Sequence, residues 1–334
     1  MALYLGIDGG GSRTQACLGD ERGRILAKAA AGPSNPTKVG IESAKRELLR
    51  AAWAVLRMAP GIPASDGHPL SGAARGGHRR PLLAAVCAGV AGVDRAAISR
   101  PLLAWLRKTI PARRHLLATD AAIALEAALG AAPGMIVVSG TGSIAYARNR
   151  QGETLRAGGW GASFDDAGGG YDLGRKAVTA ALHDFDGRGE HTVLTSRICR
   201  ALKLSVITQI VLKKLEIQQV AALFPLVSEA ARQGDRVARR LCAQAGADLA
   251  QLAVALARRL GTRGRLPVVC AGGVFRSNLI LRRSFARYVR QRLPRVHVRL
   301  LQREPVEGAL AMARNLNSAD LRPAAHGLRA VSRS

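Results

Sequence analysis

Short apolar runs alternate along this chain with longer segments in which apolar residues recur three or four positions apart. The runs are typical of buried strands, and they occupy residues 2–7, 15–18, 25–29, 82–88, 115–118, 135–138, 144–147, 267–274 and 297–301. The helical periodicity occupies residues 41–57, 95–107, 171–184, 191–203, 206–224, 226–260, a segment from Asn278, and 307–314. Strands that alternate with helices predict an α/β fold.

One supersecondary unit occurs twice. Strand 2–7 enters the turn GGGS (9–12), and strand 135–138 enters the turn GTGS (140–143), 131 residues later. Each turn is followed by a second strand and then by a polar, glycine-containing hairpin. The repeat indicates two related α/β halves with a cleft between them.

The composition bears on whether a nucleic acid is a partner of this protein. The chain has 334 residues and a net charge of +27, but aromatic residues make up only 4%. Because the arginines are spread along the sequence without a nucleic-acid-binding motif, we interpret the charge as a scattered, solvated surface that attracts phosphate-bearing ligands, and we expect no nucleic-acid partner. Residues 60–80 are rich in Pro, Gly, Ser and Arg, which predicts a mobile surface loop.

The cellular location of the protein and the state of its cysteines are predicted from patterns that the sequence lacks. No apolar run is long enough to span a membrane, and no signal-peptide pattern opens the chain, so no membrane partner and a cytoplasmic location are expected. The five cysteines are far apart and include no CxxC pair, which is typical of buried free thiols.

The first glycine turn lies in GIDGGGSRT (6–14). A dinucleotide-binding GxGxxG motif would need glycine where Thr14 stands, and a P-loop would need Lys followed by Ser or Thr where Ser12 and Arg13 stand. Both motifs also need a helix where this sequence predicts a strand. There remains a turn whose backbone N–H groups can surround a phosphate, with Asp8 placed to hold Mg²⁺ through water.

Five motifs in order resemble a known family. They are GIDGGGSRT, TDAA (119–122), SGTGSIA (139–145), AGGWG (157–161) and CAGGV (270–274). Over residues 3 to 313 the chain is similar to the BadF/BadG/BcrA/BcrD-type ATPase family, which includes N-acetylglucosamine and glucosamine kinases of the actin/sugar kinase/heat-shock ATPase superfamily. The resemblance implies two ribonuclease-H-like (actin-like ATPase) domains that close over Mg·ATP and a sugar. It assigns residues 1–118 to the first domain, residues 119–314, with a helical insertion at about 175–260, to the second, and 315–334 to a flexible tail.

The resemblance also implies roles for individual residues. Asp8 would organise Mg²⁺, and Asp120 would be the general base. The ATP phosphates would contact Gly10, Gly11, Ser12 and Thr14 in the first turn, and Thr141 and Gly142 in the second. The adenosine would lie against Gly272 and Gly273. The sugar would contact Asn35, Ser143, Trp160, Gly161 and Asp166.

Two positions have competing interpretations. An Asp at a strand end suits a general base, but Asp120 is also a candidate N-cap for the helix that follows. After GGWG the family's sugar kinases continue with a GDEGS-like stretch, whereas this chain has FDDAGGGYDLG. Asp166 stays in register, but Ala167 replaces a glutamate, and Asp165 and Asp172 are candidate substitutes for that carboxylate.

The favoured function is an ATP-dependent hexosamine kinase acting on the 6-hydroxyl of N-acetylglucosamine or glucosamine, with a homodimer as the expected assembly. The first alternative is an ATPase activator of a radical dehydratase or benzoyl-CoA-type reductase. Such activators hold an iron–sulfur cluster through paired cysteines, and Cys17, Cys87 and Cys270 offer no such pairing. The second alternative is a non-catalytic ATP- or sugar-binding regulator whose basic surface binds nucleic acid. The sequence leaves the choice of sugar open.

Overall fold

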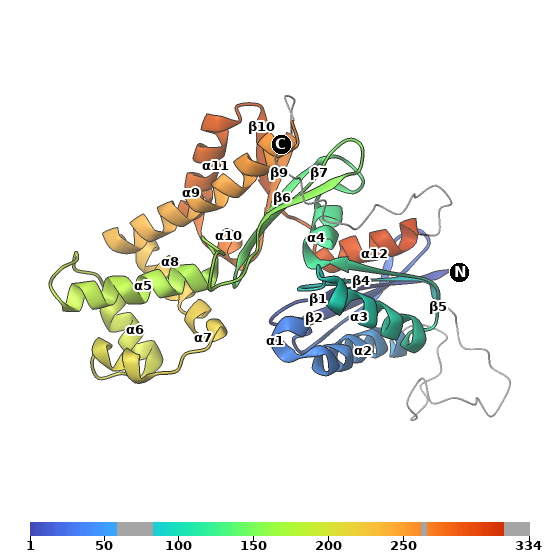
Figure 1. The fold of residues 1–334 in the computed structure, drawn as a ribbon, viewed down its shortest axis with the longest axis horizontal. Coiled ribbons are helices and arrows are strands. Elements are labelled where there is room, and N and C mark those ends of the chain that lie inside the picture. The colour runs from blue at the N-terminus through green and yellow to red at the C-terminus, as the bar shows by residue number, and fades with distance from the viewer. Residues whose placement is uncertain (59–82, 262–265, 317–334) are drawn as a thin grey trace. The chain divides into compact units, whose positions relative to one another are not determined.

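The computed structural model describes residues 1–58, 83–261 and 266–316, which form two compact units (Figure 1). The first unit contains Met1–Ala132 together with residues 302–316, and the second contains Pro133–Leu301. The loop expected at 60–80 and the tail from residue 317 lie outside the described residues.

The sheet of the first unit has the strand order β3-β2-β1-β4-β5. An antiparallel meander of three strands is extended by two parallel strands on the other side of β1. The strands are β1 (Leu3–Gly9), β2 (Thr14–Asp20), β3 (Ile25–Ala31), β4 (Leu83–Val90) and β5 (Ala112–Thr119). The helices are α1 (Pro36–Val39), α2 (Ile41–Arg57), α3 (Ala96–Thr109), α4 (Asp120–Leu129) and α12 (Pro305–Asn315).

The sheet of the second unit repeats that topology strand for strand. Its order is β10-β9-β6-β7-β8, so β6 is central, pairs antiparallel with β7 and parallel with β9. The strands are β6 (Gly134–Ser139), β7 (Ser143–Arg148), β8 (Thr154–Gly158), β9 (Leu266–Ala271) and β10 (Val296–Leu300). The two related α/β halves predicted from the glycine turns are therefore confirmed.

The helices of the second unit correct two sequence predictions. The helix expected at 206–224 is a 3₁₀ turn and a short helix, because a capping box between Glu216 and Gln219 starts a new element. The helix expected at 226–260 breaks at Gly234, whose φ is +102°, and restarts with Asp235 as N-cap. The elements are α5 (Gly170–Phe185), α6 (Leu194–Leu202), η1 (Ile207–Leu212), α7 (Ile217–Ala221), α8 (Phe224–Arg232), α9 (Arg236–Arg259), α10 (Gly273–Ser277) and α11 (Leu279–Arg292). None of the described helices is long and apolar enough to cross a membrane.

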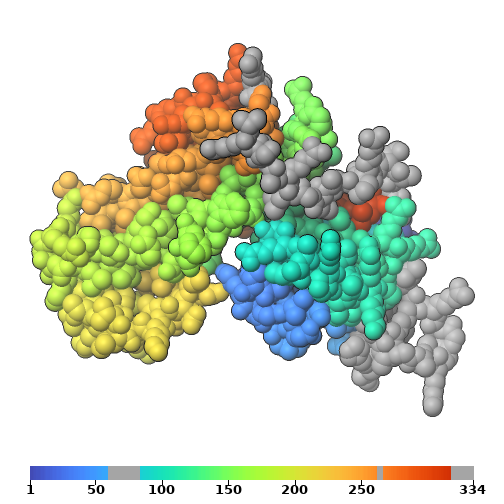
Figure 2. Space-filling model, viewed as in Figure 1, coloured from blue at the N-terminus to red at the C-terminus, as the bar shows by residue number. Residues whose placement is uncertain are grey.

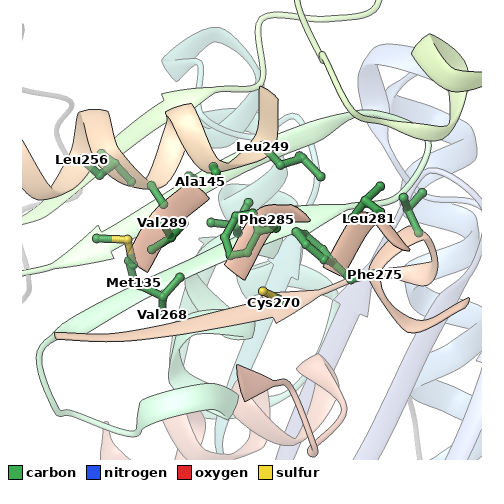
Figure 3. Close-up of a cluster of buried hydrophobic side chains, with 14 of the residues drawn as sticks. Met135, Ala145, Leu249, Leu256, Val268, Cys270, Phe275, Leu281, Phe285 and Val289 are labelled. Atoms are coloured by element: carbon green, nitrogen blue, oxygen red, sulfur yellow. The ribbon is translucent and has the colours of Figure 1, made fainter. Parts of the chain in front are cut away.

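Helices α9 and α11 share the core of the second unit with its sheet (Figure 3). Leu249 and Leu256 come from α9, and Phe285 and Val289 come from α11. The Phe275 and Phe285 rings meet edge to face, with their centroids 5.1 Å apart. Burial of this whole apolar face holds α11 rigidly against the unit.

Helix α12 completes the first unit. Its backbone packs directly on β1, where a Cβ on Gly6 would overlap the main chain at Leu310. It also packs on α4, where Gly308 lies against the Ile123 carbonyl. The contacts therefore group α4 and α12 with residues 1–118, whereas the sequence analysis expected both helices in the second domain.

Candidate functional site

The opening glycine turn joins β1 to β2. Gly10 N donates a hydrogen bond to Arg13 O at 2.9 Å, which closes the turn, and the Ser12 side chain is exposed. Gly10 O in turn accepts from Ser34 N at 3.0 Å, so the segment after β3 supports the turn from behind. Gly11 and Ser12 are left at the tip, where a phosphate can approach the backbone.

Thr14 braces this turn from inside the fold. Its side chain is completely buried, its hydroxyl donates to Gly32 O at 2.7 Å, and it lies 2.7 Å from the Ser34 hydroxyl. This differs from the phosphate contact expected of Thr14, because its hydroxyl is already used within the protein. Ser34, which the sequence analysis did not single out, is its buried partner.

Two carboxylates lie at the same edge of the first sheet. Asp8 is the penultimate residue of β1, and Asp120 follows β5, which runs parallel to β1 through β4. Burial raises the pKa of Asp8 to about 7, helped by the negative charges of Asp120 and Glu304 and opposed by Arg13. Carboxyl ends of parallel strands are where open α/β sheets bind ligands.

Asp120 is the first residue of α4, and Thr119 is the N-cap. The Thr119 hydroxyl accepts from Ala122 N at 3.2 Å, so the interpretation of Asp120 as the cap is wrong. Asp120 Oδ1 accepts from Ala121 N at 2.9 Å. Burial raises the pKa of Asp120 despite that bond, and Asp94 adds to the rise, which makes the ionised carboxylate a stronger base.

The residues around Asp8 suit a magnesium ion that keeps most of its water. The Asp8 carboxylate has no hydrogen-bond donor among the described residues, while Asp120 and Glu304 add negative charge around it. The described residues contain no group of three His, Cys, Asp or Glu that could chelate a metal ion. Mg²⁺ commonly takes one or two carboxylates and completes its shell with water and substrate phosphates.

The side-chain oxygen of Asn35 is already used in hydrogen bonds within the protein. It is the N-cap of α1, and its Oδ1 accepts from Thr37 N at 3.0 Å and from Thr37 Oγ1 at 2.7 Å. Gly92, with φ +80°, packs beside Oδ1, where a Cβ would come within 2.7 Å. The Asn35 Nδ2 group therefore remains as its donor for a ligand.

Lys38 is a candidate site residue that the sequence analysis missed. It lies in the last turn of α1, and a Cβ on Gly11 would be 3.2 Å from Lys38 Nζ. No carboxylate of the described residues pairs with this exposed ammonium group. The signal was a lysine three residues after Asn35, but only the fold of α1 brings it over the glycine turn.

The second glycine turn is bonded to the altered loop that follows GGWG. Gly140 N donates to Gly142 O at 2.9 Å, and the main chain of residues 140–141 accepts from Gly170 N at 2.8 Å and Tyr171 N at 2.9 Å. The Ser143 hydroxyl donates to Ala167 O at 2.9 Å and is buried. Ser143 therefore anchors the loop, which differs from the sugar contact expected of it. Thr141 and Gly142 remain partly exposed at the tip of the turn.

Asp166 lies against Gly142. Its φ of +62° is unusual for a residue other than glycine, and a Cβ on Gly142 would overlap its Oδ2 atom. Asp166 Oδ1 is also within 3.4 Å of Gly161 N. Three residues predicted to bind ligand (Gly142, Gly161 and Asp166) are thus adjacent.

Of the two candidate substitutes for the missing glutamate, Asp172 is already used. Its Oδ2 accepts from Gly168 N at 3.0 Å and pairs with Lys176 Nζ at 2.7 Å. Asp165 is partly exposed and remains the candidate substitute.

Trp160 is exposed, and the two glycines after β9 differ in what surrounds them. The Trp160 side chain is 65% exposed, as the flanking glycines predict, and the Arg156 guanidinium lies 4.2 Å from its ring centroid. Gly272 has φ +97°, and a Cβ there would overlap the Ser139 carbonyl, whereas a Cβ on Gly273 would meet open space. Gly272 is needed for the backbone, and Gly273 leaves room for a ligand.

The chain is similar to known proteins over nearly its whole length. The model of the BadF/BadG/BcrA/BcrD ATPase family matches residues 5–313. An N-acetylmuramic acid/N-acetylglucosamine kinase of Clostridium acetobutylicum is 31% identical over 320 residues, covering 94% of this chain and 99% of the relative. An N-acetyl-D-glucosamine kinase of Dictyostelium discoideum is 26% identical and covers 94% of this chain and 98% of the relative.

Solved structures share the fold as well. A crystal structure from Chromobacterium violaceum, provisionally assigned as an N-acetylglucosamine kinase, has 30% identity and a TM-score of 0.72, covering 93% of this chain and 98% of that one. A ROK family glucokinase from Streptomyces griseus shares the fold at 19% identity and a TM-score of 0.57. The predicted pair of actin-like ATPase domains is thereby confirmed. The chain belongs to the BadF/BadG/BcrA/BcrD ATPase family.

Proposed function

We propose that this protein is an ATP-dependent hexosamine kinase that phosphorylates the 6-hydroxyl of N-acetylglucosamine or glucosamine. The observation that carries the proposal is that Asp8 and Asp120 lie at the same edge of the first sheet, where the exposed glycine turn follows β1. The family relatives named as hexosamine kinases support the substrate class.

Asp120 is the proposed general base. It accepts the proton of the sugar 6-hydroxyl as that oxygen forms a bond to the γ-phosphorus, while the bond from the γ-phosphorus to the β–γ bridging oxygen breaks and ADP leaves. Burial helps, because a carboxylate with a raised pKa holds the proton more strongly. Mg²⁺, held at Asp8 through water, would neutralise the charge that develops on the phosphate oxygens.

The remaining residues bind and orient the two substrates. We assign Gly10, Gly11, Ser12, Thr141 and Gly142 to the phosphates, and Gly272 and Gly273 to the adenosine. Asn35 Nδ2, the Trp160 ring, Gly161 and Asp166 are assigned to the sugar. Thr14 and Ser143 act as positioning residues, since their hydroxyls hold the two turns in place. A cytoplasmic homodimer stays a prediction.

The first test is the release of ADP with different acceptors. We expect ADP release to require a sugar and to be fastest with N-acetylglucosamine, glucosamine or N-acetylmuramic acid, and slower with glucose. A coupled ADP assay with and without each sugar measures this. Turnover that is independent of sugar would instead favour the activator function. ATP binding without turnover would favour the non-catalytic regulator.

Lys38 is proposed to stabilise the transferred phosphoryl group. Replacing Lys38 with methionine keeps an unbranched side chain that lacks only the terminal ammonium group. It removes the charge over Gly11, so kcat/KM for ATP is expected to fall about 100-fold. The exposed Lys108 on α3 provides the matched control, and Lys108→Met should leave the kinetics unchanged. Equal kinetics of Lys38→Met and Lys108→Met would exclude Lys38 from the site.

A further inference from the structure

Helix α11 carries a basic hollow that the kinase site does not use. The hollow measures about 560 Å³, is open to solvent, and is lined by Arg282, Arg283, Ala286, Arg287, Arg290 and Gln291. Figure 2 shows α11, in orange-red, at the surface of its unit. None of these residues belongs to the proposed ATP or sugar contacts.

The four arginines of the hollow are not neutralised. None of them pairs with a carboxylate of the described residues, whereas Arg188, Arg232 and Arg240 elsewhere in the same unit do so. Residues 279–303 contain eight arginines and no Asp or Glu. The positive charge is therefore concentrated on and just after α11, which differs from the scattered basic surface expected from the sequence.

Arg282 adds an observation of its own. Its Nε atom is buried and has no hydrogen-bond partner among the described residues. A buried donor without an acceptor costs free energy, and a charged donor costs more than a neutral one. A phosphate in the hollow would supply the negative charge that the Arg282 guanidinium lacks.

The spacing of the arginines favours a linear polyanion. The lining residues form two rows along α11, 282–286–290 and 283–287–291. Arg283 and Arg287 are about 6 Å apart along the helix axis, and Arg282 and Arg290 are about 12 Å apart. Ala286, in the middle of the first row, has a short side chain and leaves space between Arg282 and Arg290. Leu281, Phe285 and Val289 bury the opposite face, so the two rows sit on a helix that is already held in place.

We propose that the α11 hollow binds the phosphate backbone of a nucleic acid without sequence preference. Because the hollow is open to solvent, a nucleic-acid chain can pass along it, whereas a small ligand bound there would stay mostly in water. Arginine is well suited to the task, because its planar guanidinium can bind a phosphate through two hydrogen bonds. This function goes beyond the proposed kinase and does not depend on it.

The test measures how binding depends on salt. A fluorescent single-stranded oligonucleotide is titrated with the full-length protein at several salt concentrations, and anisotropy reports the affinity. Each phosphate contact to single-stranded nucleic acid contributes about 0.7 to the slope of log K against log salt. The double variant Arg283→Ala/Arg287→Ala should therefore lower the magnitude of the slope by about 1.4.

The control removes the same charge elsewhere. The variant Arg57→Ala/Arg107→Ala takes two exposed arginines from the first unit and should leave the slope unchanged. Thermal unfolding checks that both variants fold, and ADP release should be unchanged in both. Three results would each overturn the proposal: no binding at low salt, an equal loss of slope in both variants, or full displacement of the oligonucleotide by tripolyphosphate at equal phosphate concentration.

Discussion

Replacing Asp120 with asparagine is expected to lower the rate of phosphoryl transfer about 1,000-fold while ATP affinity stays near that of the wild type. Asparagine keeps the shape of the side chain and an oxygen that can accept from Ala121 N, so the start of α4 is preserved. What disappears is the carboxylate that takes the proton of the sugar. Steady-state ADP release gives kcat, and titration with a fluorescent ATP analogue gives the affinity.

The pH profile separates a base from a structural role. In the wild type, kcat should rise with pH as the Asp120 carboxyl ionises, because only the carboxylate accepts a proton; burial moves that rise to higher pH. The Asp120→Asn variant should lack this rise. Thr119→Ala is the control for the helix itself: it removes the cap at a cost of about 1 kcal/mol in unfolding free energy, with kcat retained. Wild-type turnover in Asp120→Asn would show that another group is the base.

Replacing Asp8 with asparagine is expected to abolish activity and at the same time to stabilise the metal-free protein at high pH. The pKa of Asp8 is about 7 in the folded protein, whereas an aspartate in an unfolded chain has its ordinary pKa of 3.8. Between these values the folded state holds a proton that the unfolded chain has lost, so the free energy of unfolding falls as pH rises through this window. The full effect, reached above pH 7, amounts to at most about 4 kcal/mol.

The asparagine side chain of the Asp8→Asn variant cannot ionise, so the free energy of unfolding of this variant should not fall through the same pH window. Thermal unfolding in EDTA should give a Tm that falls from pH 4 to pH 8 more steeply in the wild type than in Asp8→Asn. Mg²⁺ with an ATP analogue should raise the wild-type Tm at pH 8 and leave the Tm of the variant almost unchanged, because the metal has lost its carboxylate. If both proteins show the same dependence of Tm on pH, Asp8 does not carry the raised pKa.

The repeated unit and the glycine turns could be predicted from the sequence because their signals are local. A short apolar run with β-branched residues, such as Met135–Val138, favours a strand, and the glycine-containing turn that follows marks its end. The helical region at 206–260 was less predictable, because its apolar periodicity runs past the caps that divide it.

The sequence by itself determined the family, the α/β class and the short list of residues able to bind a phosphate or accept a proton, since each depends on residue type and spacing. Only the tertiary structure decided which of these side chains remain available. It buries Thr14 against Ser34, uses Ser143 to anchor Ala167, and brings Lys38 over Gly11. It also gathers the α11 arginines around one hollow. These outcomes depend on hydrogen bonds and packing between segments distant in sequence, or on which face of a helix its neighbours cover, and neither is encoded in any single stretch of chain.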